Sequence, residues 1–204
     1  MLILLGCETS LTAQTNSDYN KVIKIETGRP FSIANKAFNR YYKGLYTINS
    51  NIDFLFKNNI VIGAFIGVSA FEDTKEDRTY VPLRPELTKF NNITGSFELG
   101  YEKKIAKKSY FAITGNIGYS MASFQQFFLE NDSLIASQNE NAISWGVAAK
   151  YGWLIEGKGA IGFFVRFRTN HFVYKPQLFE GQEIQENNFP TMYWSTGLLF
   201  SFGI

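Results

Sequence analysis

Cysteine is almost absent from the sequence, because Cys7 is the only one among 204 residues. A mature chain without cysteine forms no disulfide and offers neither a thiolate nucleophile nor a cysteine-based metal site. Long apolar runs are missing too, since no window approaches the roughly 18 apolar residues of a membrane-spanning helix. The net charge of +2 gives no reason to expect a nucleic-acid partner. Phosphate-binding loops, metal-ligand clusters and nucleophile elbows are also missing, so we expect no cofactor and no metal.

Aromatic residues, in contrast, make up 17% of the chain. Many of them alternate with small or polar residues, most clearly over residues 142–172. The apolar positions there are Ile143, Trp145, Val147, Ala149, Tyr151 and Trp153, followed beyond a turn at residues 156–159 by Ile161, Phe163, Val165 and Phe167. A period of two is typical of a strand with one apolar face. This stretch therefore predicts a β-hairpin.

The same alternation recurs along the chain and predicts eight strands. They begin at residue 21 and then cover residues 44–57, 60–71, 92–102, 109–123, the two halves of 142–172, and 191–204. In the first strand Gly28, Arg29 and Pro30 are expected to bend or end the strand, and residues 31–43 could hold a short helical turn. Short turns alternate with long connections at residues 72–91, 124–141 and 173–190. We expect one domain, residues 15–204, folded as an all-β, eight-stranded, up-and-down antiparallel barrel.

We interpret the apolar face of this barrel as facing lipid. A closed barrel satisfies its backbone polar groups inside a bilayer, and lumen-facing residues keep its hydrophobic content unremarkable, here 45%. Short periplasmic turns and long extracellular loops are typical of outer-membrane barrels, which predicts periplasmic termini. Two aromatic girdles follow, Tyr46, Tyr119, Trp145 and Trp194 near the outer interface and Phe56, Tyr101, Phe111, Trp153 and Phe202 near the periplasmic one. The alternative is a soluble ligand-binding barrel with the apolar set inside, which predicts solubility without detergent.

The chain resembles the small eight-stranded outer-membrane β-barrel family, which includes the OmpA transmembrane domain and OmpX-like proteins. The resemblance covers residues 21–204 and includes the final strand, Tyr193-Trp194-Ser195-Thr196-Gly197-Leu198-Leu199-Phe200-Ser201-Phe202. It departs from the family at the end, where Gly203 and Ile204 replace the usual aromatic residue. The resemblance implies a monomer in the bacterial outer membrane, in contact with outer-membrane lipid and lipopolysaccharide and inserted by the barrel-assembly machinery. Because no residues are left for a soluble domain after the eighth predicted strand, we do not expect the peptidoglycan-binding module that accompanies some relatives.

Residues 1–14 resemble the remainder of a signal peptide. Leu2 to Leu5 form a short apolar fragment, and Leu11-Thr12-Ala13 resembles a cleavage site with small residues. We expect maturation near Ala13 or Gln14. The alternative takes Leu4-Leu5-Gly6-Cys7 as a lipobox, in which case Cys7 would carry a lipid.

The polar positions of the strands predict a charged lumen. Its members are Lys24, Glu26, Asp53, Glu98, Lys150, Arg166 and Arg168. Unpaired buried charge is expensive, so we expect a packed plug in which Arg166 and Arg168 pair with Asp53, Glu98 or Glu26. The alternative is a narrow, porin-like channel gated by such an ion pair. An interior only just wide enough for side chains favours the plug.

Two further features bear on activity. His171, the only histidine, follows strand seven, and a lipid A deacylase or acyltransferase would need it to pair with a serine such as Ser120, Ser123 or Ser144. The connection at residues 72–91 carries mixed charge, and Arg78, Arg84 or Lys89 could contact lipopolysaccharide phosphates. A histidine without a paired motif is more often an interface residue. We therefore expect a structural or cell-surface interaction protein and no enzyme.

Overall fold

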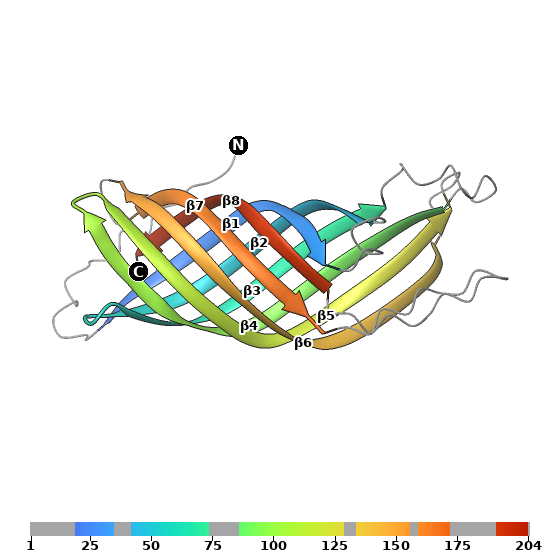
Figure 1. The fold of residues 1–204 in the computed structure, drawn as a ribbon, viewed down its shortest axis with the longest axis horizontal. Helices are drawn as coiled ribbons and strands as arrows, with labels where there is room; N and C mark the ends of the chain where they lie inside the picture. The colour runs from blue at the N-terminus through green and yellow to red at the C-terminus, as the bar shows by residue number, and fades with distance from the viewer. Residues whose placement is uncertain are drawn as a thin grey trace, which may run out of the picture.

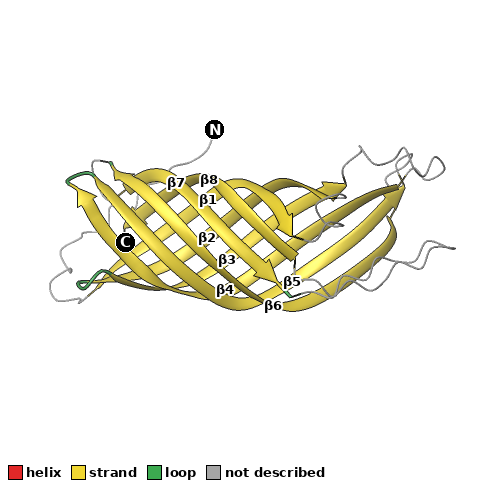
Figure 2. Ribbon diagram, in the orientation of Figure 1, coloured by secondary structure: helices red, strands yellow, loops and turns green. Residues whose placement is uncertain are grey.

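In the computed structural model, the described residues are 19–34, 42–73, 86–128, 134–155, 159–171 and 191–203. They form eight strands (Figures 1 and 2). The strands are β1 Tyr19–Ala34, β2 Tyr42–Phe56, β3 Ile60–Asp73, β4 Glu86–Ala106, β5 Ser109–Phe128, β6 Leu134–Leu154, β7 Gly159–Asn170 and β8 Thr191–Gly203. The predicted signal peptide with Cys7 lies outside the described residues. Among the residues described, no helix is long and apolar enough to span a membrane.

Each strand pairs antiparallel with the next, and β1 also pairs with β8, from Val22 opposite Gly203 to Ala34 opposite Met192. The sheet is therefore a closed barrel, seen from the side in Figure 1. Closure removes the two free edges that an open sheet would leave with unpaired backbone N–H and C=O groups. The predicted eight-stranded, up-and-down antiparallel barrel is confirmed.

The outer face is apolar and the inner face is polar. Phe97, in the middle of β4, is 77% exposed, whereas its neighbour Glu98 is 1% exposed. The same contrast holds along β6, where Trp145 and Val147 are exposed and Ser144 is buried. A soluble barrel would distribute these side chains the other way round. The alternation identified in the sequence thus corresponds to an apolar exterior around a polar lumen.

The first strand is longer than predicted. β1 runs through Gly28, Arg29 and Pro30 to Ala34, and β2 begins at Tyr42. The helical turn predicted at residues 31–43 is therefore wrong for residues 31–34 and 42–43, which belong to strands. Residues 35–41 lie outside the described residues. The pairing of β1 with β2 ends at Gly28, beyond which β1 pairs only with β8. A proline is tolerated at such a position because only one neighbouring strand requires a donor there.

Four more strands, β3 to β6, extend beyond their predicted limits. β4 begins at Glu86 and β3 ends at Asp73, so the connection predicted at residues 72–91 is shorter. β5 and β6 take up most of the connection predicted at residues 124–141, and they project as a hairpin past β7 and β8 (Figure 1). Similarly, residues 103–106 belong to β4, and the turn is only Lys107 and Lys108. Outside the apolar belt both faces of a strand can be polar, so the alternation that marks a strand disappears.

The outer face generates a direct test at Phe97. Replacing Phe97 with Arg places a charge in the lipid-facing belt, which costs about 2–4 kcal/mol near the midplane of a bilayer. Urea-induced unfolding from lipid vesicles measures this loss, with Phe97→Leu as the matched control that keeps the surface apolar. Equal stability of the two variants would mean that the face is in contact with water.

Candidate functional site

The barrel lumen contains the largest group of buried charged side chains in the described chain. The seven residues predicted to lie there, Lys24, Glu26, Asp53, Glu98, Lys150, Arg166 and Arg168, all point inward and are at most 1% exposed. They come from five strands, β1, β2, β4, β6 and β7. The antiparallel register brings them together across the lumen in three levels, which we describe from the middle outward.

The middle level consists of Glu26, Glu98, Lys150 and Arg166, which we call the central cluster. Arg166 donates to Glu26 twice, from Nη2 to Oε1 at 2.7 Å and from Nε to Oε2 at 3.0 Å, and its Nη1 lies 3.3 Å from Oε2 of Glu98. Lys150 pairs with Glu98 and lies 3.3 Å from Glu26. Two cations therefore neutralise two carboxylates, and the cluster connects β1, β4, β6 and β7 through side chains.

Two asparagines of β2 complete the hydrogen bonding of these carboxylates. Asn49 donates to Glu26 at 2.9 Å, and Asn51 donates to Glu98 at 3.0 Å. Buried ion pairs are tolerated only when further hydrogen bonds satisfy the remaining lone pairs. The central cluster therefore has the composition of a stable plug rather than of a loose group of charges.

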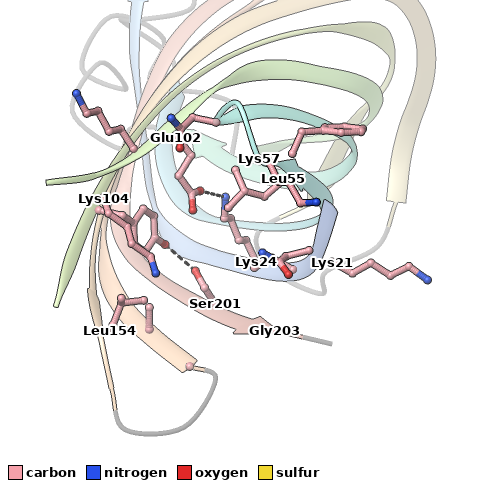
Figure 3. A pocket seen from close by; sticks show the side chains of 17 residues that line it. Lys21, Lys24, Leu55, Lys57, Glu102, Lys104, Leu154, Ser201 and Gly203 are labelled. Carbon is pink, nitrogen blue, oxygen red and sulfur yellow. Dashed lines mark hydrogen bonds and ion pairs between the residues drawn. The ribbon is translucent and has the colours of Figure 1, made fainter. Parts of the chain in front are cut away.

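The level next to the short turns is built on Lys24. Its Nζ lies 2.6 Å from Glu102 (Figure 3) and 2.9 Å from Asp53. Glu102 was missed by the sequence analysis, although it continues the inward alternation of Glu98 along β4. Asp53 thus pairs with a lysine and not with an arginine as predicted. Tyr110, also missed, shares a hydrogen bond of 2.8 Å with Ser201 at this level.

This level opens into a vestibule of about 700 Å³ at the short-turn mouth. Its charged lining consists of Glu102 and five lysines, Lys21, Lys24, Lys57, Lys103 and Lys104. Figure 3 shows Lys24 directed toward Glu102, with Lys21, Lys57 and Lys104 around the opening. The four lysines other than Lys24 are exposed, so this mouth of the barrel is basic.

Arg168 occupies the third level, toward the long connections. Within the described chain, no carboxylate lies within ion-pair distance of it, which differs from the predicted pairing. Its Nη1 donates to the hydroxyl of Tyr193 at 3.4 Å, and its guanidinium lies 4.5 Å from the centre of the Phe65 ring. Phe65 has the guanidinium of Arg166 near it as well, at 4.4 Å. Arg166 lies one inward position closer to the middle of the barrel, and it pairs with both carboxylates of the central cluster, Glu26 and Glu98.

Beyond Arg168 the lumen is filled by aromatic side chains that the sequence analysis missed. Tyr42, Phe71, Phe90 and Tyr193 pack with ring centroids 5.4–6.0 Å apart, and we call them the aromatic cap. They are at most 4% exposed. The central cluster and the aromatic cap together fill much of the lumen between the vestibule and the long connections.

Eight of the nine predicted girdle residues lie on the outer face, whereas Phe56 lines the vestibule. Tyr46, Tyr119, Trp145, Trp194, Tyr101, Phe111, Trp153 and Phe202 are exposed, and Phe56 is half-buried. Trp145 and Trp194 both pack against Phe167, at centroid distances of 5.8 and 5.3 Å. Toward the short turns, Trp153 packs against Tyr151 and Phe163 at 4.7 and 5.7 Å. Their placement at membrane interfaces stays a prediction.

His171 lies on the exterior of the barrel. It is exposed, and its Nε2 accepts a hydrogen bond of 3.3 Å from Nε1 of Trp145. Two of the candidate serines, Ser120 and Ser144, are buried in the lumen. In the described part of the chain, no three His, Cys, Asp or Glu side chains form a group that could hold a metal ion.

Comparison with known proteins gives similar structures but no similar sequences. No protein-family model matches the chain, and no curated protein matches it. Ail, the attachment invasion locus protein of Yersinia pestis, solved in complex with the heparin analogue sucrose octasulfate, is 11% identical over 91% of this chain and 100% of its own, with a TM-score of 0.50. The chain has the fold of the small eight-stranded outer-membrane β-barrels.

Two further barrels are less similar. Neisserial surface protein A is 11% identical over 90% of this chain and 96% of its own, with a TM-score of 0.49. The N-terminal barrel domain of OprF from Pseudomonas aeruginosa is 8% identical over 91% of this chain and 99% of its own, with a TM-score of 0.42. At 11% identity the likeness to Ail concerns the fold alone and not a ligand.

The central cluster predicts an asymmetric response to substitution. Replacing Arg166 with Met leaves two buried carboxylates facing Lys150 alone, which costs about 3–5 kcal/mol of unfolding free energy. Adding Glu26→Gln to this variant restores a neutral Lys150–Glu98 pair and should recover part of the loss. Urea unfolding in uncharged detergent measures all three proteins, with exposed Lys103→Met as the control. A single variant as stable as the wild type would contradict the assigned role of Arg166.

Proposed function

We propose that this chain is an integral protein of the bacterial outer membrane, with a plugged lumen and a structural or cell-surface interaction role. The observation that carries the proposal is the combination of an apolar exterior with a central cluster whose charges are neutralised inside the barrel. An apolar exterior suits a bilayer, and a lumen filled with paired side chains suits a protein that does not conduct. On this proposal the chain is not an enzyme.

The distribution of the connections supports an orientation with the short turns in the periplasm. β2 and β3 are joined by residues 57–59 and β4 and β5 by Lys107 and Lys108, whereas β7 and β8 are joined by residues 171–190. Outer-membrane barrels place short turns in the periplasm and longer loops outside. The chain termini would then be periplasmic, and the projecting β5–β6 hairpin would stand on the cell surface.

The proposed partners follow from the same orientation. Outer-membrane lipid would contact the apolar belt, and lipopolysaccharide would contact the outer rim. Of the basic residues predicted to bind its phosphates, Arg78 and Arg84 lie outside the described residues, and Lys89 lies within β4 rather than in a loop. The closing strand β8, which pairs with both β7 and β1, would be the segment read by the barrel-assembly machinery. We propose a monomer, because closure pairs every strand within one chain.

A channel is the main competing function, and the central cluster argues against it. A gate requires an ion pair that can exchange partners, whereas Arg166 makes hydrogen bonds to both Glu26 and Glu98, and Lys150 pairs with both as well. Opening would therefore have to separate several charged contacts together.

Single cysteines test the orientation in intact cells. Ser137 is exposed on the projecting hairpin, and Lys107 is exposed in a turn at the opposite end. A membrane-impermeant maleimide should label Ser137→Cys on intact cells and Lys107→Cys only after the outer membrane is permeabilised. The unsubstituted chain reports any labelling of Cys7. The reverse pattern would contradict the proposed orientation, and labelling of neither site in any membrane fraction would contradict the location.

A further inference from the structure

Arg168 is a buried cation without a counter-charge in the described chain. It is 1% exposed, and its Nε and Nη2 have no hydrogen-bond partner. Its remaining contacts are the Tyr193 hydroxyl at 3.4 Å and the face of the Phe65 ring at 4.5 Å. Neither contact is an anion. Because an unpaired charge is costly to bury, Arg168 calls for a counter-charge that the described part of the chain does not supply.

The charges of the lumen are unevenly distributed along the barrel. Lys24 faces two carboxylates, Asp53 and Glu102, so the level next to the vestibule carries one excess negative charge. The central cluster is neutral, with two cations and two carboxylates. The excess positive charge is therefore concentrated at Arg168, on the far side of the cluster. The missing counter-charge must be negative and must lie at the Arg168 level.

A chain of hydrogen bonds runs around the lumen at this level. It passes from Arg168 through Tyr193, Asn92, Thr94 and Ser120 to Asn170, which lies two residues after Arg168 on β7. These bonds fix the orientation of the side chains around the arginine. They leave Nδ2 of Asn170 without a partner, in addition to Nε and Nη2 of Arg168. Three unused N–H donor atoms therefore lie on neighbouring inward positions of one strand.

The adjoining wall has further unpaired polar atoms and little bulk. Both amide atoms of Asn116 and the hydroxyl of Ser144 lack hydrogen-bond partners. Asn116 of β5 lies opposite Gly146 of β6, which in turn lies opposite Arg168 of β7. Because glycine has no side chain, none separates Asn116 from Arg168 at this position of the sheet. Buried polar atoms without protein partners call for a bound ion or water.

We propose that the lumen binds a small inorganic anion of about the size of chloride at Nε and Nη2 of Arg168. Guanidinium groups bind anions through short, charge-assisted hydrogen bonds, and the carboxylates of the described lumen are engaged elsewhere. The site lies between the central cluster and the aromatic cap in a barrel whose interior is only just wide enough for side chains, which favours a single small ion. The anion would neutralise Arg168 locally, at a level of the lumen where the described chain supplies no carboxylate.

The test uses the full chain refolded in uncharged detergent. Its thermal unfolding midpoint is measured in increasing sodium chloride and in sodium gluconate at equal ionic strength, because gluconate is too large for the site. The wild type should unfold at a higher temperature in chloride, with a saturable dependence. Arg168→Met should lose this difference, and Arg29→Met, which removes an exposed arginine of β1, should keep it.

Chloride NMR provides a readout that does not depend on any variant. The folded wild type should broaden the chloride signal beyond detergent alone, and bromide should displace the bound chloride and reverse the broadening. Arg168→Lys, which keeps the charge, should retain part of the effect if Arg168→Met fails to fold. The proposal is overturned if the wild type shows neither broadening nor a difference between chloride and gluconate. It is equally overturned if a folded Arg168→Met variant keeps both, since chloride would then bind elsewhere on the protein, for example at the exposed vestibule lysines.

Discussion

Closure of the sheet between β1 and β8 is the constraint on which the rest of this structure depends. In a lipid environment each unpaired backbone N–H or C=O group costs several kcal/mol, and only a helix or a closed sheet avoids this cost. Closure fixes which residues face lipid and which face the lumen, because successive side chains on every strand point to opposite sides. It also forces charged side chains from β1, β2, β4, β6 and β7 into one narrow interior, where they must neutralise one another.

The lumen meets this requirement through an ordered series of levels. A lysine with two carboxylates lies next to the basic vestibule, a neutral cluster fills the middle, and Arg168 lies beneath the aromatic cap. The excess negative charge thus faces the mouth that carries the exposed lysines. The excess positive charge faces the mouth toward the long connections. The plug is therefore electrically polarised along the barrel, although its four cations and four carboxylates balance in total.

Much of the barrel could be predicted from the sequence because the contrast between lipid and lumen imposes a strict period of two. Trp145, Arg166 and Phe97 all point to the predicted sides. The period fails where that contrast ends, so the extensions of β5 and β6 were predicted as a loop. It also fails at a bulge: the register between β2 and β3 shifts between Gly44 and Tyr46, which turns Tyr42 into the lumen. A one-residue shift of this kind reverses every side chain beyond it.

The pairings inside the lumen could not be predicted for a different reason. Alternation gives the direction of a side chain but not its height in the barrel, which depends on strand stagger and tilt. Arg166 and Arg168 are equivalent in the pattern, yet only Arg166 reaches Glu26 and Glu98. Glu102 could have been found by continuing the inward positions of β4 beyond Glu98. Phe71 and Tyr193 of the aromatic cap could have been found in the same way, because they occupy inward positions of the strands predicted at residues 60–71 and 191–204. Tyr42 and Phe90 had no such signal, because they lie just before the strands predicted at residues 44–57 and 92–102.

The most direct measurement of the central claim uses the tryptophans as they stand. The sequence contains three, Trp145, Trp153 and Trp194, and all three are exposed on the outer face of the barrel. Fluorescence of the refolded chain is compared in vesicles of ordinary lipid and of lipid brominated along its acyl chains, since bromine quenches tryptophan only at close contact. The account predicts strong quenching in the brominated vesicles. Equal fluorescence in both, from a protein that also stays soluble without detergent, would contradict it and place the apolar face inside.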